Sequence, residues 1–436
     1  MLKIGCIADD FTGATDLANN LVRSGMRVVQ AIGVPAGGGG EADGSADAQV
    51  DAVVIALKSR TVPAKEAIKQ SLEALRWLQS KGAQQIYFKY CSTFDSTAEG
   101  NIGPVTEALM DALGCEVSLS SPAFPDNQRT VFKGYLFVGN GLLNESGMQN
   151  HPLTPMADAN LVRVMQSQCQ RKVGLLDYAV VARGAVAISL RLQALKAEGV
   201  VIAIVDAVSN DDLHRVGAAL KGAPLIAGGS GMAIGLAQNF GILPSSAASS
   251  LPQAEGLRAV ISGSCSLATN RQVAHFAATG GQAMAVDPLR IAAGADVTSE
   301  VLDWARSALP KGTVLVYSTA DADGVKASQQ QLGVQEAGAL VEQSLAAIAT
   351  GLVGLGVRQL VVAGGETSGA CVQALGVGKM RIGFQIDPGV PWCHAACAAP
   401  NSEGTQAAIH LALKSGNFGS DDFFTKAFEM LGKDGA

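Results

Sequence analysis

The sequence predicts an α/β chain made of two α/β domains with mainly parallel sheets. Its 436 residues are too many for one ordinary hydrophobic core. Hydrophobic residues make up 48% of the chain and charged residues only 16%, as expected where parallel strands are buried on both faces. Short apolar runs also alternate with amphipathic segments along the chain. This alternation is typical of parallel strands joined by right-handed crossover helices.

The first half of the chain contains a series of apolar runs that predict strands, with helical segments between them. The expected strands are 3–8, 27–32, 51–57, 85–90, 116–119, 200–205 and 224–227. The expected helices are 13–25, 64–80, 98–113, 187–199 and 209–221. Residues 131–147 predict a β-hairpin that turns at Gly139, Asn140 and Gly141. The Gly-rich segment 36–49 predicts a flexible surface insertion.

Residues 242–256 predict a linker, because this segment has two prolines, several Ser and Ala, and no periodicity. We therefore expect one domain over 1–241 and a second over 257–436. In the second domain the alternation restarts. Its expected strands are 258–264, 313–319, 359–365 and a last one within 411–419 that ends at Lys414, Ser415 and Gly416.

The composition limits the classes of binding partner and the cellular compartment expected for this protein. A net charge of −6 argues against nucleic acid as the main partner. The eight cysteines form no CxxC pair, which indicates reduced thiols and a cytoplasmic protein. No signal-peptide pattern is expected, and the apolar segment 338–355 carries Glu342 and Gln343, which make it too polar for a membrane span. The cysteines near His394 do not match a zinc spacing, so no metal site is expected, and a homodimer is left open.

Polar and charged side chains follow the predicted strands of the first domain at their carboxyl ends, where ligands collect in open parallel sheets. Arg and Lys there suit a carboxylate, and Asp and Asn suit hydroxyl groups, so this edge predicts a site for a small polyhydroxylated acid. The candidate residues are Asp9, Asp10, Lys58, Arg60, Lys89, Ser92, Asp95 and Asn127.

Each of these residues also has a structural explanation. Asp10 or Thr12 could cap the helix that begins near Gly13. Lys58 and Arg60 could be solvated loop charges, and the segment around Asp95 could be a polar loop that caps the next helix. We favour function for the two adjacent carboxylates, because a second acid adds repulsion unless a cation or a ligand lies nearby.

The second domain places glycines and hydroxyl groups after its strands. "VVAGGETSGA" at 361–370, "VISGSCS" at 260–266 and "LALKSGNFG" at 411–419 each combine a strand end with Gly, which lets a backbone approach a phosphate closely. Together they predict a nucleotide phosphate site, although each one alone is a weak signal. The chain has no Walker A loop, and "GGSGMAIG" at 228–235 does not match the dinucleotide fingerprint.

The segments "CIADDFTGATDLANNLVRSGMRV", "KYCSTFDSTAEGNIGPVTEAL", "PAFPDNQRTVFKGYLFV", "HPLTPM", "VAGGETSGA" and "LALKSGNFG" resemble the four-carbon acid sugar kinase family. The likeness runs from residue 3 to about 430. In the wider family the third strand end tends to read "KTDSTLRGNIG", and the longer form here, without the Arg, resembles the branch that acts on 3-oxo-tetronates.

The resemblance implies an N-terminal domain that binds a sugar acid, a C-terminal domain that binds ATP with its Mg²⁺, and an active site in the cleft between them. The implied reaction is transfer of the γ-phosphoryl group to the C4 hydroxyl of a tetronate. The implied nucleotide contacts are Ser264, Gly364, Gly365, Glu366, Thr367 and Gly416.

For catalysis we expect Asp10 to orient the sugar acid or accept its proton, with Asp95 as the rival base, and Lys89 and Arg60 to bind the carboxylate or the transferred phosphate. Glu366 could bind the Mg²⁺ directly or through water. D-erythronate or D-threonate is the alternative substrate. An NAD(P)-dependent oxidoreductase and a non-catalytic sugar-acid sensor are the more distant alternatives.

Overall fold

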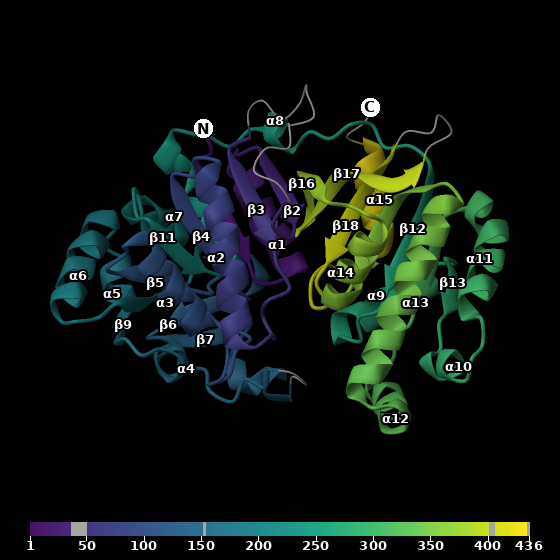
Figure 1. Cartoon of the computed structure of the whole chain (residues 1–436), viewed down its shortest axis with the longest axis horizontal. Helices are drawn as coiled ribbons and strands as arrows, with labels where there is room; N and C mark the ends of the chain where they lie inside the picture. Colours follow the sequence, from purple (N-terminus) through teal and green to yellow (C-terminus); the bar gives the residue numbers. More distant parts are fainter. Residues whose placement is uncertain (36–49, 151–153, 401–405, 434–436) are drawn as a thin grey trace. The chain divides into compact units, whose positions relative to one another are not determined.

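The computed structural model describes residues 1–35, 50–150, 154–400 and 406–433. The chain divides into two compact units, Met1–Ser249 and Ser250–Ala436, drawn from purple to teal and from teal to yellow in Figure 1. The insertion expected at 36–49 lies outside the described residues. Each unit is built of β-strands with helices packed against them.

The first unit is built on a parallel sheet. Its strands are β1 (Ile4–Ala8), β2 (Val28–Ile32), β3 (Ala52–Ala56), β4 (Gln85–Lys89), β5 (Ser118–Ser121), β9 (Val173–Leu176), β10 (Ile202–Val205) and β11 (Leu225–Gly228). They run in the order β2-β3-β1-β4-β11-β5-β10-β9, and every neighbouring pair is parallel. The expected parallel sheet is confirmed. The short edge strand β9 was not predicted, because its four residues are only partly buried and do not alternate clearly.

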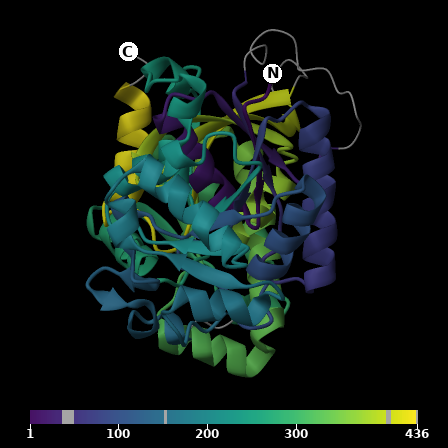
Figure 2. The same ribbon diagram turned by 90° about the vertical axis from the view of Figure 1, so that its left-hand side faces the viewer.

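Helices cover both faces of this sheet, as Figures 1 and 2 show. They are α1 (Phe11–Arg23), α2 (Ala64–Ser80), α3 (Ile102–Leu113), α4 (Leu161–Gln168), α5 (Tyr178–Val181), α6 (Ala185–Ala197), α7 (Asn210–Ala219) and α8 (Ser246–Ser249). Short 3₁₀ helices η1 (Pro125–Asn127), η2 (Leu143–Glu145), η3 (Met148–Asn150), η4 (Gly231–Gly235) and η5 (Ala237–Phe240) lie in the connections. One helical layer joins α1 to α7 through η4, and another joins α2, α3 and α4.

A small antiparallel sheet replaces the single hairpin expected at 131–147. Its strands are β6 (Arg129–Phe132), β7 (Tyr135–Val138) and β8 (Gly141–Leu142). The chain does turn at Gly139 and Asn140, but it turns first at Lys133 and Gly134, which both have positive φ. Asp206 stabilises this first turn, because its carboxylate accepts the N–H groups of Lys133 and Gly134 at 2.8 Å each.

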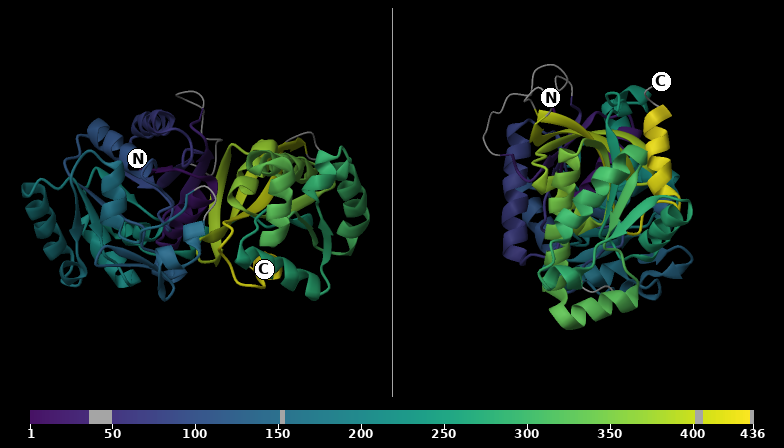
Figure 3. Two further views of the ribbon diagram at one scale, coloured as in Figure 1. Left: turned by 90° about the horizontal axis from the view of Figure 1, so that it is seen from below. Right: turned by 90° about the vertical axis from the view of Figure 1, so that its right-hand side faces the viewer.

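The second unit has a mixed sheet with helices on its faces (Figure 3). Its strands are β12 (Leu257–Ser262), β13 (Gln282–Ala285), β14 (Val314–Tyr317), β15 (Val357–Ala363), β16 (Lys379–Asp387), β17 (Val390–Pro400) and β18 (Gln406–Lys414). They run in the order β13-β14-β12-β15-β18-β17-β16, and β17 is antiparallel to both of its neighbours. The hairpin β16–β17 was not predicted from the sequence. The last strand was also placed too late, because β18 ends at Lys414 and 415–419 form a loop.

The helices of the second unit pack in two groups. They are α9 (Leu267–Ala278), α10 (Pro288–Ala292), α11 (Val297–Ala308), α12 (Ala322–Leu332), α13 (Val334–Gly354), α14 (Gly365–Ala374) and α15 (Phe423–Lys433), with the 3₁₀ helix η6 (Leu309–Lys311). The first group gathers α10, α11, α12 and α14 around α13, and the second pairs α9 with α15. Trp392 on β17 is fully buried, and its ring lies 5.7 Å from that of Phe428 on α15.

Within the described part of the chain one helical segment, Gln335–Gly354, is long and apolar enough to cross a membrane by length and composition alone. It belongs to α13, which lies at the centre of its helical group. Leu345, Ile348, Ala349 and Leu352 are completely buried there. This packing explains the apolar composition as that of a core helix.

We expect Gly217→Ala to destabilise the first unit, because a Cβ on this α7 residue would lie 2.3 Å from the carbonyl oxygen of Gly235 in η4. Overpacking of this kind costs about 1–3 kcal/mol in the free energy of unfolding, measured by urea denaturation. Gly338→Ala in α13 is the matched control. Its Cβ would meet nothing within 4 Å, so it should be neutral or slightly stabilising. Equal behaviour of the two variants would contradict the close packing of α7 on η4.

Candidate active site

The carboxyl edge of the first sheet brings three chain segments together. β1 lies between β3 and β4, with Ala8 opposite Ala56 and Lys89. The backbone continues this alignment past the strands, because the Asp9 N–H donates to the Lys89 carbonyl at 3.1 Å and the Asp9 carbonyl accepts the Arg60 N–H at 3.2 Å. The residues that follow these strands therefore face one another, as the sequence analysis expected.

Arg60 binds both of the adjacent carboxylates. Its guanidinium makes a two-point contact with Asp9, from Nε at 2.9 Å and from Nη2 at 2.7 Å. Nη2 also donates to Oδ1 of Asp10 at 2.7 Å. Arg60 and Asp10 retain 21% and 23% of their side-chain exposure, whereas Asp9 retains 7%. Asp10 and Arg60 are thus the members of this group that a ligand can touch.

Asp10 also has the capping role that was the structural alternative. It is the N-cap of α1, and its carboxylate accepts the Gly13 N–H and the Thr12 hydroxyl, both at 3.0 Å. Burial acts to raise the pKa of Asp10, but Arg60, Lys89 and these hydrogen bonds hold it below its usual value. Burial raises the pKa of Asp9, with Arg60 opposing the rise. Asp10 therefore has the lower pKa of the two carboxyl groups.

Lys89 is the second cation of this edge. It is almost completely buried, and its ammonium donates to the Tyr90 carbonyl at 2.7 Å. A Cβ on Gly13 would lie 3.1 Å from this ammonium and 2.1 Å from Oδ1 of Asp10, so the absence of a side chain at Gly13 makes room for both groups. Asp95, the rival base, accepts the Thr93 hydroxyl at 2.6 Å and lies 3.9 Å from Arg60.

The remaining predicted residues have different environments. Lys58 is exposed directly after β3, and Ser92 is buried in the loop after β4. Asn127 is half-buried at the end of η1, and its carbonyl accepts a hydrogen bond from Arg129. These three residues belong to the loops of the carboxyl edge.

Two charged residues next to this edge were not among the predicted site residues. Asp16 is buried on α1, and burial raises its pKa to about 6 while Lys89 and Arg129 oppose the rise. The pKa of Arg129 is lowered by burial, against the effects of Cys91, Asp16 and Asp95. Asp16 could have been found from the helical spacing of the polar residues Thr12, Asp16 and Asn19, which places them on one face of the helix.

Two buried amides that hold the site loops were also missed. Asn101 donates from Nδ2 to the carbonyls of Ser59, Arg60 and Val62 at 2.8, 3.1 and 2.8 Å, and so fixes the loop that carries Arg60. Gln168 fixes the next loop in the same way, because its Nε2 donates to the Ser96 hydroxyl at 2.6 Å and to the Thr97 carbonyl at 2.5 Å.

In the second unit, the predicted glycine and hydroxyl residues meet at the carboxyl ends of β12, β15 and β18. These strands are neighbours, and the backbone extends their pairing. The Ser264 N–H donates to the Ala363 carbonyl at 3.2 Å, and the Gly364 N–H donates to the Lys414 carbonyl at 2.8 Å. The segments after the three strands therefore form one continuous edge.

The two key glycines are required by close contacts at this edge. Gly364 has φ +125° and a Cβ there would lie 3.0 Å from the Thr367 hydroxyl and 3.2 Å from the Ser264 nitrogen. A Cβ on Gly416 would lie 2.6 Å from the Ser264 hydroxyl. Ser264, Gly364, Thr367 and Gly416 are thus brought together, and Gly365 begins α14 beside them. The first turn of α14 directs backbone N–H groups to this edge, which suits a phosphate.

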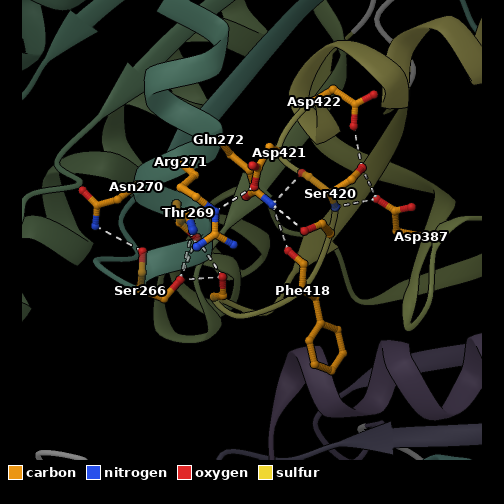
Figure 4. A network of polar contacts seen from close by, with 12 residues as sticks. Ser266, Thr269, Asn270, Arg271, Gln272, Asp387, Phe418, Ser420, Asp421 and Asp422 are labelled. Carbon is orange, nitrogen blue, oxygen red and sulfur yellow. Dashed lines mark hydrogen bonds and ion pairs between the residues drawn. The ribbon is translucent and has the colours of Figure 1, made fainter. Parts of the chain in front are cut away.

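Figure 4 shows the polar network that holds the loop after β18. Ser266 and Thr269 on the α9 side bind the Gly416 carbonyl, and Gln272 donates to the carbonyls of Phe418, Gly419 and Ser420. Asp387 binds the Ser420 N–H at 2.9 Å. Lys414 is buried beneath the loop, and burial lowers its pKa to about 7. Glu366 and Cys265 are exposed at the same edge.

Two family models match the chain, one in each unit. The model for a sugar-binding N-terminal domain matches residues 4–236, and the model for a nucleotide-binding C-terminal domain matches residues 259–424. The first match contains the Arg60–Asp9–Asp10 contacts. The second contains the edge around Ser264, Gly364 and Gly416.

Proteins named 3-oxo-tetronate kinase are similar to this chain over nearly its whole length. One from Burkholderia multivorans is 56% identical, covering 99% of this chain and 98% of its own. One from Pseudomonas fluorescens is also 56% identical, covering 98% of this chain and 97% of its own.

Solved structures are similar at the level of the whole fold. A crystal structure from Salmonella typhimurium LT2 has a TM-score of 0.83 and 45% identity, covering 98% of this chain and 99% of its own. A Haemophilus influenzae protein has a TM-score of 0.75 and 44% identity, covering 98% and 100%. With both domain models and full-length relatives in agreement, the chain belongs to the 3-oxo-tetronate kinase family of four-carbon acid sugar kinases.

Proposed function

We propose that this chain transfers the γ-phosphoryl group of ATP to the C4 hydroxyl of 3-oxo-tetronate. The observation that carries the proposal is the contact of Arg60 with Asp9 and Asp10, which puts a guanidinium and two carboxylates at one edge of the sugar-binding match. The substrate class is taken from the names of the full-length relatives. D-erythronate and D-threonate are the alternative substrates.

In this proposal Asp10 receives the proton of the C4 hydroxyl. The oxygen then forms a bond to the γ-phosphorus while the bond to the ADP oxygen breaks, and ADP leaves with that electron pair. The lowered pKa of Asp10 keeps it ionised at neutral pH, so its carboxylate can accept a hydrogen bond from the hydroxyl and orient it before the proton moves. Its exposure of 23%, against 11% for Asp95, favours it as the group that touches the substrate.

The cations of the same edge would bind negative charge. Arg60 already pairs with the two carboxylates, Lys89 lies near Asp10, and both Lys89 and Arg129 lie near the further acid Asp16. These cations can bind the carboxylate of the sugar acid and stabilise the charge of the transferred group. The cations that surround Asp10, the proposed proton acceptor, could thus also recognise the carboxylate of the sugar acid.

The nucleotide would be held by the second unit. Backbone N–H groups at the start of α14, with Ser264 and Gly416, would bind the phosphates. Glu366 and the hydroxyls of Ser264 and Thr367 offer the oxygen ligands that suit Mg²⁺. Mg²⁺ bound with ATP neutralises phosphate charge. The reaction requires the γ-phosphate to reach the C4 hydroxyl, so the proposal includes that the two sites come together during catalysis. It also includes a cytoplasmic location.

A screen of ADP release over 3-oxo-tetronate, D-erythronate and D-threonate tests the function directly. We expect kcat/KM for 3-oxo-tetronate to exceed the others by about tenfold or more, a difference worth about 1.4 kcal/mol. Sugar-acid binding without ADP release would instead support a sensor, and a nicotinamide absorbance change would support an oxidoreductase.

We expect Asp10→Asn to lower kcat by about 100-fold or more, because a general base commonly contributes that much. Asn retains the capping ability of Asp, so α1 should remain folded. ADP affinity, measured by calorimetry, should stay within about twofold because the nucleotide site lies in the other unit. Asp126→Asn is the matched control, because Asp126 pairs with Arg23 away from the Arg60 contacts. An unchanged kcat would remove Asp10 as the base and leave Asp95 to be tested by the same substitution.

Asp16→Asn should separate stability from activity. The native pKa of about 6 lies above the ordinary value of 3.8, so ionised Asp16 reduces stability as the pH rises from about 4 to 6. The variant should therefore gain free energy of unfolding relative to the parent over that interval and keep a gain of about 1–3 kcal/mol above pH 6. Its kcat should fall, because Lys89 and Arg129 lose a nearby negative charge. Urea unfolding from pH 4 to 8 checks the gain, and a pH-independent difference would contradict it.

A further inference from the structure

Lys414 is the last residue of β18, and its side chain has no exposed surface. Its ammonium nitrogen donates hydrogen bonds to the oxygen atoms that surround it. The acceptors are the Thr269 hydroxyl at 3.0 Å and the carbonyls of Ser415 at 3.1 Å, Gly416 at 3.0 Å and Phe418 at 3.2 Å. The side chain thus points back under the loop that follows its own strand, so its contacts are with the protein.

The Gly416 carbonyl is the point where these contacts converge. Besides the Lys414 ammonium it accepts the Ser266 hydroxyl at 2.6 Å and the Thr269 hydroxyl at 2.9 Å. Figure 4 shows Ser266 and Thr269 side by side at this end of the network. A carbonyl held by several donors fixes the plane of its peptide group, because the peptide bond is planar.

The fixed peptide determines where the next N–H group points. In a trans peptide the N–H is opposite to the C=O, and no peptide bond in the described residues is cis. The Gly416 carbonyl points into the buried ammonium, so the Asn417 N–H points to the outer side of the loop, where Asn417 is exposed. Gly416 packs against Ser264 on that same edge, so this donor is available next to the other nucleotide contacts.

We propose that Lys414 is a positioning residue of the nucleotide site, which fixes the peptide between Gly416 and Asn417 so that the Asn417 N–H donates to a nucleotide phosphate. The proposal rests on the proposed ATP-dependent function. It differs from a P-loop, where the lysine itself contacts the phosphates. Here the lysine acts from beneath, through the backbone, and the loop presents an N–H group to the ligand.

The energetics of burial agree with this role. Burial alone lowers the pKa of Lys414 to about 7, so removing this ammonium from water is costly. The carbonyl and hydroxyl acceptors offset part of that cost by hydrogen bonding. A phosphate bound on the other side of the loop would add the attraction of its negative charge. A buried cation placed below a phosphate-facing loop is therefore stabilised by the ligand it helps to hold.

The experiment compares ADP binding to the parent chain, Lys414→Met and a matched control, measured by calorimetry without sugar acid. Met keeps most of the length of the lysine side chain and removes its donors. We expect the ADP dissociation constant to rise by about tenfold or more, as for loss of hydrogen bonds to charged groups. The KM for the sugar acid should change by less than about twofold. Phe428→Leu is the control, because it weakens the packing on Trp392 in the same unit and removes none of the hydrogen bonds that hold the loop.

ADP binding by folded Lys414→Met within twofold of the parent would overturn the proposal, and so would an equal loss in Phe428→Leu. If Lys414→Met does not fold, Thr269→Val takes its place. This change removes a hydroxyl that joins Lys414 to the Gly416 carbonyl, and an unchanged ADP affinity would again overturn the proposal. If the parent binds ADP but phosphorylates no sugar acid, the proposed function fails while this inference stands. A parent that binds no ADP removes both.

Discussion

The contact of one guanidinium with two adjacent buried carboxylates is the constraint on which the first unit depends. Asp9 and Asp10 follow each other at the end of β1, and their mutual repulsion would be costly in a buried site without a cation. Arg60 supplies that cation from the loop after the neighbouring strand β3, and Asn101 holds this loop. Removing only Arg60 would leave both carboxylates without their ion-pair partner, with Lys89 as the remaining nearby cation. The contact with Arg60 also keeps Asp10 ionised and leaves it partly exposed. The stability of the first unit and its proposed chemistry therefore both depend on Arg60.

The candidate anion site of the second unit is built from different groups. Its candidate site is made mostly of backbone and hydroxyl groups at three neighbouring strand ends, and its cation is hidden. Neutral donors held in place cost little when no ligand is bound, whereas a cluster of exposed cations would repel itself. The two units therefore use opposite means. The first unit pairs its carboxylates with a cation, and the second unit uses the orientation of backbone N–H groups at a helix N-terminus.

Much of this organisation could be predicted from the sequence, because the end of a buried strand is marked by a change from apolar to polar residues. That change located Asp9, Asp10, Arg60, Lys89 and the glycine edge. What it could not show was which polar residues touch. Asp206 stabilises the turn at Lys133 and Gly134 from more than 70 residues away, and a Lys-Gly pair is a weak hairpin signal by itself. The hairpin β16–β17 was missed although Asp387-Pro388-Gly389 is a turn sequence, because β17 is buried and its apolar run does not alternate.

The exposed thiol of Cys265 has a practical consequence. The chain has eight cysteines, and all of them lie in the described part of the structure, where Cys265 alone is classed as exposed. Burial raises the pKa of the Cys6 and Cys393 thiols and so lowers their reactivity. Cys265 stands between Ser264 and Ser266, so a fluorophore coupled to it would sit beside the glycine edge. The native chain thus carries an attachment point from which binding at the proposed nucleotide site can be followed by fluorescence emission, without an engineered cysteine.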